Sequence, residues 1–170
     1  MGNLFDLDIT GLIKKKSGAP LGDAHELFVR AIMVRLGLEA GKADLSSSPY
    51  DVITVGFVNP DGEKRILRVQ VKTIGENSLP LTGGSRSGVD REYISREKVY
   101  KQSPEHSDLV FGVDKKTLDI YVVPTSFLDM WGDSISKNKI QVLKNNWDIL
   151  INWNPSYLTQ LKEQIKGASK

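Results

Sequence analysis

The chain contains no cysteine and only two histidines, His25 and His106, among its 170 residues. Disulfide frameworks, thiolate zinc sites and cysteine nucleophiles are therefore excluded. A Ser/His/Asp triad would have to use one of the two histidines. His25 points about 100° away from its neighbour Glu26 on a helix, so we expect a structural or surface role for it. His106 lies in a polar loop sequence, where we expect it to be exposed.

Long hydrophobic runs are also missing. The sequence has no stretch of about 18 apolar residues, so we expect no membrane-spanning helix and no membrane partner. No apolar stretch follows the basic triplet at 14–16, so we expect no secretory signal and a cytoplasmic location. The 23 basic and 21 acidic residues leave a net charge of only +2. That balance is too mild to identify a nucleic-acid partner, so the local distribution of charge has to be examined.

The sequence does show patterns that predict helices and strands. Its length of 170 residues is that of one ordinary domain. The apolar spacing at 23–36 predicts a helix, with Leu27, Ala31 and Val34 on its apolar stripe. Residues 51–58 and 65–72 predict two strands, and the Asn-Pro-Asp-Gly turn between them predicts that they form a hairpin. Beyond the hairpin, the sequence predicts an exposed loop at 73–88 and a second helix at 93–101.

The rest of the chain continues the alternation of strands and helices. Further strands are predicted at 109–113, 118–123 and 140–143. A short helix ending at Met130 is expected to be capped by Thr125 or Ser126, and a terminal helix at 156–166 by Ser156. The whole pattern predicts a mixed α/β fold, with a central mixed sheet flanked by helices.

Four polar residues carry the chemistry of this pattern. Glu26 lies in the first turns of the first helix, and Asp51 opens the first strand of the hairpin. Gln70 and Lys72 lie two residues apart on the second strand, so both side chains share one face of the sheet. A hairpin of this length can bring the start of its first strand beside the end of its second. We therefore expect all four side chains to converge.

This combination of side chains suits metal-assisted phosphodiester hydrolysis. Carboxylate and amide oxygens are hard ligands of the kind that Mg²⁺ prefers. The ion polarises the phosphate and lowers the pKa of a bound water. A lysine such as Lys72 can orient that water and neutralise charge that builds up on the phosphate. For each residue alone, an ordinary structural role remains the alternative: Asp51 can serve a turn, and Lys72 can be a solvated strand end.

The order of these residues resembles the PD-(D/E)XK nuclease superfamily. The resemblance rests on Glu26, the string Pro49-Tyr50-Asp51, and the string Gln70-Val71-Lys72-Thr73. Gln70 stands where the family usually has an acid, which is similar to a branch that includes group I intron homing endonucleases. The segment 107–124 also resembles the last two core strands of such proteins. The resemblance therefore implies a single nuclease domain, 1–170, of restriction-endonuclease-like fold, with a core at about 20–128 and an extension of unknown role at 129–170.

The resemblance also implies roles for the individual residues. Asp51 would be the central metal ligand, with Gln70 at the position of the second acidic ligand. Glu26 would bind the metal directly or through water, and the Val71 carbonyl is a further candidate ligand. Lys72 would be the catalytic lysine. The implied cofactor is Mg²⁺, for which Mn²⁺ can substitute, and the glutamine at position 70 leaves one carboxylate fewer to hold it.

Two groups of basic residues are candidates for contacts with the DNA backbone. The first group follows the hairpin and begins inside a small, glycine-rich segment at 83–88; its members are Arg86, Arg91, Arg96, Lys98 and Lys101. The second group is Lys137, Lys139 and Lys144, in a stretch without acids from Ser134 to Trp147. A solvated surface is the alternative for both groups. The implied partner is double-stranded DNA.

These observations lead to a hypothesis with alternatives. The leading function is a metal-dependent DNA endonuclease that cuts both strands at a specific site, of homing or restriction type. A Holliday-junction or other structure-selective resolvase is the alternative enzyme, and a non-cutting DNA-binding module on a nuclease scaffold is the alternative of another class. One small domain supplies one active site, so cutting both strands requires a homodimer or a homotetramer.

Overall fold

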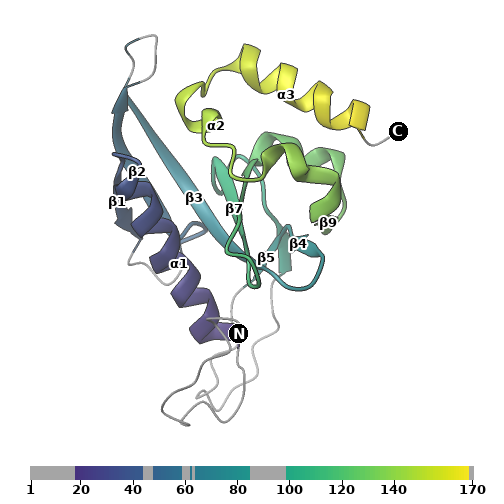
Figure 1. Ribbon diagram of the computed structural model, residues 1–170, viewed down its shortest axis with the longest axis horizontal. Coiled ribbons are helices and arrows are strands. Elements are labelled where there is room, and N and C mark those ends of the chain that lie inside the picture. Colours follow the sequence, from purple (N-terminus) through teal and green to yellow (C-terminus); the bar gives the residue numbers. More distant parts are fainter. Residues whose placement is uncertain (1–17, 44–47, 59–61, 63, 85–98, 169–170) are drawn as a thin grey trace.

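A five-stranded mixed sheet forms the centre of the fold (Figure 1). The computed structural model describes residues 18–43, 48–58, 62, 64–84 and 99–168. The strands follow the order β1-β2-β3-β7-β8 across the sheet. They are β1 Glu39–Lys42, β2 Val52–Val58, β3 Lys64–Ile74, β7 Leu109–Asp114 and β8 Ile120–Pro124. Neighbouring strands are antiparallel except β3 and β7, which are parallel. The predicted mixed α/β class and the predicted hairpin are confirmed.

The register of the hairpin decides which side chains meet. Val52, the first residue of β2, lies opposite Val69 in β3. Just before β2, the backbone N–H of Asp51 donates to the carbonyl oxygen of Val69 at 2.9 Å. This register places Asp51 beside the last third of β3, where Gln70 and Lys72 lie.

The helix α1, Gly18–Arg35, lies alongside the β1–β3 half of the sheet (Figure 1). The predicted helix is confirmed, but the predicted apolar stripe is wrong. The fully buried side chains are His25, Val29 and Met33, whereas Leu27 and Val34 are 61% and 59% exposed. Residues 27–34 are apolar on almost every side except at Arg30, so spacing alone could not identify the face that meets the sheet.

The second half of the sheet is covered by the C-terminal part of the chain (Figure 1). Its helices are η2 Thr125–Met130, η3 Lys137–Leu143, α2 Asp148–Ile151 and α3 Pro155–Ala168, where η marks a 3₁₀-helix. Ile140, Leu143, Leu161 and Ile165 are buried and join the same hydrophobic cluster as the strands. Residues after 129 therefore contribute to the core that supports β7 and β8.

The segment after β3 differs from the predicted exposed loop. β4 Ser78–Pro80 pairs with β9 Ser134–Ser136, and β5 Thr82–Gly84 pairs with β6 Val99–Lys101. Leu79 and Leu81 are fully buried, which holds this segment against the core. Gly83 is also buried, and a Cβ there would lie 2.7 Å from the ring of Tyr100, so a larger residue would have to displace that side chain. Close strand pairing, rather than flexibility, explains the glycine at this position.

Other local predictions are also corrected. Residues 99–101 form β6 instead of the end of a helix, and the rest of the predicted helix at 93–101 lies outside the described residues. Residues 140–143 are not a strand but the end of η3, in which Ile140 and Leu143 are buried three residues apart. A spacing of three is the period of a 3₁₀-helix.

The predicted caps of the two later helices are wrong. Asn154 caps α3, because its Oδ1 accepts from the backbone N–H of Tyr157 at 2.9 Å, and Pro155 occupies the first helical position instead of Ser156. Proline suits that position because it has no N–H to satisfy. At η2 the N-cap is Pro124, and no side chain caps it. The Thr125 hydroxyl instead donates to the carbonyl oxygen of Ser107 at 2.6 Å.

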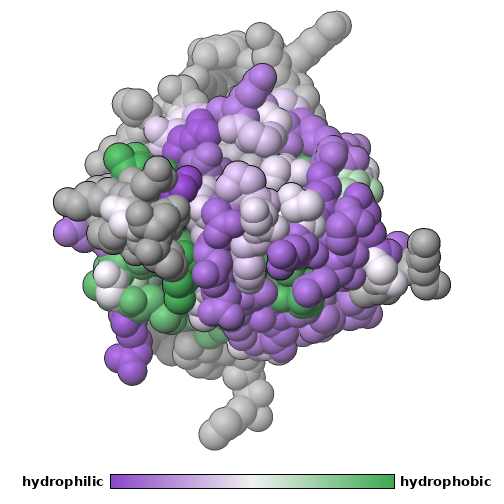
Figure 2. Space-filling model, turned by 90° about the horizontal axis from the view of Figure 1, so that it is seen from above, coloured by the Kyte–Doolittle hydropathy of each residue, from purple (hydrophilic) through white to green (hydrophobic). Residues whose placement is uncertain are grey.

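The surface seen from above is largely hydrophilic, with hydrophobic residues in small separate patches (Figure 2). Such patches are ordinary on a protein surface. None of the helices in the described ranges has the length and apolar content needed to cross a bilayer.

An ion pair at the end of β7 stabilises the fold. The Asp114 carboxylate is buried and accepts from the Lys137 ammonium at 2.6 Å and from the Lys116 N–H at 2.8 Å. Burial raises the pKa of Asp114, but the hydrogen bonds from Lys137 and the backbone outweigh it, so the pKa is held below its ordinary 3.8. A lowered pKa stabilises the fold above pH 3.8, and that contribution is lost as the pH falls through the folded-state value.

We expect Lys137→Met to lower the free energy of unfolding by about 1.5–3 kcal/mol at neutral pH, because it leaves a buried carboxylate without its charged donor. The pKa of Asp114 should then rise, so the loss of stability on acidification should begin at a higher pH than in the wild type. Urea unfolding between pH 3 and pH 7 measures both effects. The matched control is Lys139→Met on the exposed side of η3. Equal effects of the two variants would contradict this role of the ion pair.

Candidate active site

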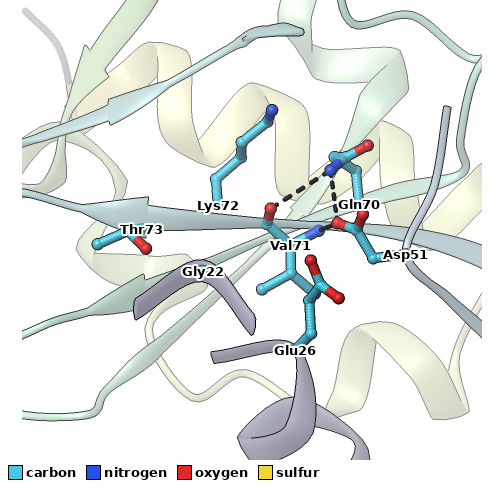
Figure 3. Close-up of a pocket in the computed structure, with 7 residues that line it drawn as sticks. All are labelled: Gly22, Glu26, Asp51, Gln70, Val71, Lys72 and Thr73. Atoms are coloured by element: carbon cyan, nitrogen blue, oxygen red, sulfur yellow. Dashed lines mark hydrogen bonds between the residues drawn. The ribbon is translucent and has the colours of Figure 1, made fainter. Parts of the chain in front are cut away.

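The four polar residues named from the sequence line one pocket (Figure 3). The pocket has a volume of about 170 Å³ and lies where α1 crosses the junction of β2 and β3. Its lining residues are Gly22, Glu26, Asp51, Gln70, Val71, Lys72 and Thr73. The predicted convergence of Glu26, Asp51, Gln70 and Lys72 is therefore present in the structure.

Strand β3 presents two of these side chains from one face. Gln70 and Lys72 are two residues apart, so they rise from the same side of the strand, whereas Val71 points to the other side (Figure 3). Glu26 approaches from α1 on the Val71 side, and its carboxylate is directed toward Val71 and Asp51 (Figure 3). The pocket is therefore lined by residues on both faces of β3 and by Asp51, which lies beside this strand.

Asp51 is fixed by hydrogen bonds to β3. Its Oδ2 accepts from the backbone N–H of Val71 at 2.7 Å and from the side-chain Nε2 of Gln70 at 2.5 Å. A carboxylate that accepts two such bonds is held in one rotamer. The side chain of Asp51 therefore has one defined position at the mouth of the hairpin.

His25 does not line the pocket but contacts Thr73, which does. Its side chain is fully buried, and Nδ1 lies 2.7 Å from the hydroxyl of Thr73 on β3. Burial lowers the pKa of His25, which favours the neutral ring. The structural role expected for this residue is confirmed, and the contact fastens α1 to the strand that carries Lys72. His106 is half-buried beside the Tyr100 ring, so its expected exposure is wrong.

Behind the site lies a polar network that the sequence did not reveal. Arg68, on the same face of β3 as Gln70, binds the segment before β7 through several bonds. Its guanidinium donates to the carbonyl oxygens of Pro104 and Glu105 and to the carboxylate of Asp108. Gln102, which is 2% exposed, donates from Nε2 to the Oε1 of Gln70 at 3.4 Å.

The basic residues named from the sequence are not assembled around this pocket in the described ranges. Arg86, Arg91, Arg96 and Lys98 lie outside the described residues. Lys137 is engaged with Asp114, and Lys139 is exposed on η3. Lys144, close by, pairs with Asp119 at 2.8 Å. Of the second basic group, Lys139 is the member whose exposure best suits contact with a partner.

The donor set of the pocket fits a hard divalent ion such as Mg²⁺. Two carboxylates and the Val71 carbonyl offer oxygen atoms, the Gln70 amide carries a further oxygen, and none of the lining residues is a soft ligand. In the part of the chain that the structure describes, no three or more His, Cys, Asp or Glu side chains cluster together. The two carboxylates, Glu26 and Asp51, therefore need the neutral oxygens of Gln70 and Val71 to complete a set.

The fold is similar to that of a bacterial homing endonuclease, I-Ssp6803I. The superposition has a TM-score of 0.59 and covers 76% of this chain and 90% of that one, at 16% sequence identity. No family model matches the sequence. No curated protein matches it either. The likeness is therefore one of fold, and the residues of the pocket have to carry the functional argument.

Proposed function

We propose that this protein is a metal-dependent DNA endonuclease of the PD-(D/E)XK type, in the branch with glutamine at the second ligand position. The observation that carries the proposal is the convergence of Glu26, Asp51, Gln70 and Lys72 in one pocket. The similarity of fold to a bacterial homing endonuclease supports a DNA substrate. A homing or restriction type of activity, which cuts both strands at a specific site, fits these observations best.

Each of these residues has a separate role in the proposed hydrolysis. Asp51, Glu26, the Gln70 amide and the Val71 carbonyl would hold Mg²⁺, or Mn²⁺ in its place. When bound, the ion supplies a Lewis acid for the phosphate and a water of lowered pKa. Lys72, on the same face of β3 as Gln70, contributes a positive charge where negative charge develops on the scissile phosphate. The hydrogen bonds from β3 keep Asp51 oriented for its part.

A single pocket of this kind cuts one strand at a time. We therefore propose that the active form is a homodimer or a homotetramer, in which two copies present their pockets to the two strands.

We expect the purified protein to cleave double-stranded DNA that carries its target site in the presence of Mg²⁺ or Mn²⁺. Removal of the metal with EDTA should abolish cleavage, and Ca²⁺ should permit binding without cutting. A plasmid library with randomised inserts, followed by sequencing of the cut ends, measures both activity and site preference. Cutting confined to branched DNA would instead favour the resolvase alternative. Tight DNA binding with no cleavage of any duplex or junction would favour the non-cutting module.

A further inference from the structure

The amide of Gln70 faces the candidate metal site with its nitrogen. Nε2 donates to Asp51 Oδ2 at 2.5 Å and lies 3.3 Å from the carbonyl oxygen of Val71. Because a carboxylate and a carbonyl only accept hydrogen bonds, this end of the amide must be the donor. Oε1 points the other way, toward Gln102. A divalent cation, however, needs the oxygen of this amide, so Gln70 has to turn its amide around before it can serve as a ligand.

Gln102 is placed so that this rotation of the Gln70 amide costs little free energy. Its Nε2 donates to Gln70 Oε1, and its own Oε1 accepts from the hydroxyl of Ser107, both at 3.4 Å. Gln102 and Ser107 are almost fully buried, so water is not at hand to replace either partner. If both amides turn together, Gln102 accepts from Gln70 Nε2 and donates to Ser107. A hydroxyl both donates and accepts, so Ser107 can end the chain in either direction.

The backbone around this chain is tied down, so the motion is confined to the side chains. The Gln102 N–H donates to Leu81 O at 2.9 Å, and the Thr125 hydroxyl donates to Ser107 O at 2.6 Å. Arg68 holds the segment between them through the carbonyl oxygens of Pro104 and Glu105. Two side-chain amides can therefore reverse inside a fixed frame.

We propose that Gln102 is a positioning residue for Gln70, and that the amides of Gln70 and Gln102 reverse together when a divalent cation binds at Asp51. The proposal rests on the metal site of the proposed function. It deepens that function by naming the residue that allows a neutral glutamine to replace the usual acidic ligand. An acid at position 70 would need no such partner, because both of its oxygens are acceptors.

The first test replaces Gln102 by leucine, which is similar in size and lacks polar atoms. In the metal-bound state the reversed Gln70 would then leave a buried Nε2 without an acceptor, which is costlier than an unsatisfied carbonyl oxygen. We expect Gln102→Leu to weaken metal binding severalfold, because the metal-free state also loses a hydrogen bond and only the difference in cost between the two unsatisfied groups remains. Mn²⁺ binding without DNA, followed by electron paramagnetic resonance, gives the affinity directly. Gln164→Leu, on the exposed side of α3, is the matched control.

A second background separates positioning from a general loosening of the fold. In Gln70→Glu the ligand has an acceptor oxygen at either end, so Gln102 no longer decides whether an oxygen faces the ion. We therefore expect Gln102→Leu to change Mn²⁺ affinity by less than about twofold in the Gln70→Glu background, and the double-mutant cycle to show strong coupling. If Gln102→Leu does not fold, Ser107→Ala removes the far end of the same chain and should weaken Mn²⁺ binding severalfold, again only when residue 70 is glutamine.

The outcomes are distinct. A severalfold loss that disappears in Gln70→Glu supports the proposal, as does a shift of the Gln102 side-chain amide resonances when Mg²⁺ is added to the wild type. An equal loss in both backgrounds would show a purely structural role and overturn it. Unchanged affinity in Gln102→Leu would overturn it while leaving the proposed nuclease untouched. Wild-type protein that neither binds Mn²⁺ nor cleaves DNA would overturn both.

Discussion

Asp51→Asn is expected to reduce the rate of single-turnover DNA cleavage by about 10³-fold or more while leaving the fold intact. Asp51 Oδ2 accepts two hydrogen bonds, from Val71 N and Gln70 Nε2, and the Oδ1 of an asparagine can accept both. What asparagine removes is the negative charge that holds a divalent ion. The metal contributes several kcal/mol to stabilising the transition state, and about 4 kcal/mol corresponds to a factor of about 10³.

The measurement is cleavage of pre-bound DNA after addition of Mg²⁺, together with binding in Ca²⁺. DNA affinity should change little, because phosphate contacts elsewhere on the protein supply most of it. Asp133→Asn, at an exposed position before β9, is the control and should cut at the wild-type rate. Asp51→Ala guards against slow deamidation of the asparagine back to aspartate. Wild-type rates in Asp51→Ala would show that the metal site lies elsewhere.

The geometry of the hairpin could be predicted from the sequence because it depends on local rules. Strand period two puts Gln70 and Lys72 on one face, and the Asn-Pro-Asp-Gly sequence predicts antiparallel pairing with β2. Once Val52 lies opposite Val69, the position of Asp51 follows. The placement of Glu26 near the hairpin required only that a helix of about the predicted length form there, and α1 is that helix.

Contacts that depend on tertiary packing could not be read in this way. Residues 27–34 of α1 are apolar on nearly every side, so the choice of Val29 and Met33 over Leu27 and Val34 is made by the sheet that the helix meets. Ile140 and Leu143 show a spacing of three that fits a 3₁₀-helix as well as an irregular strand. Neither ambiguity can be resolved without knowing the neighbouring element.

The network behind Gln70 was missed because it joins residues more than thirty positions apart. Gln102 and Ser107 flank a loop whose sequence is polar throughout and gives no periodic signal. They reach Gln70 because β7 pairs in parallel with β3, with Leu109 beside Val69, which brings the chain just before β7 against the middle of β3. The one available sequence signal was Arg68, which shares a strand face with Gln70 and Lys72 and would need a partner there.

Lys72→Met should lower the rate of the chemical step by about 10²–10³-fold, the usual effect of removing one electrostatic group that acts in the transition state. Methionine keeps most of the aliphatic stem, so β3 should keep its packing. Affinity for DNA and for Mn²⁺ should change little, since the charge of Lys72 counts most when negative charge builds up on the phosphate. Lys116→Met, an exposed lysine in the turn after β7, is the control for loss of one positive charge.

The combination of this variant with Asp51→Asn distinguishes a shared active site from two independent effects. If Asp51 and Lys72 serve the same step in the same pocket, the double variant should lose little beyond the loss in Asp51→Asn alone, because residues that act as a unit are far from additive. Independent roles would instead multiply the two losses. Single-turnover rates across a titration of Mg²⁺ measure both cases. Should Lys72→Met cut as fast as the wild type, the pocket at the junction of β2 and β3 is not the place where the phosphodiester bond is broken.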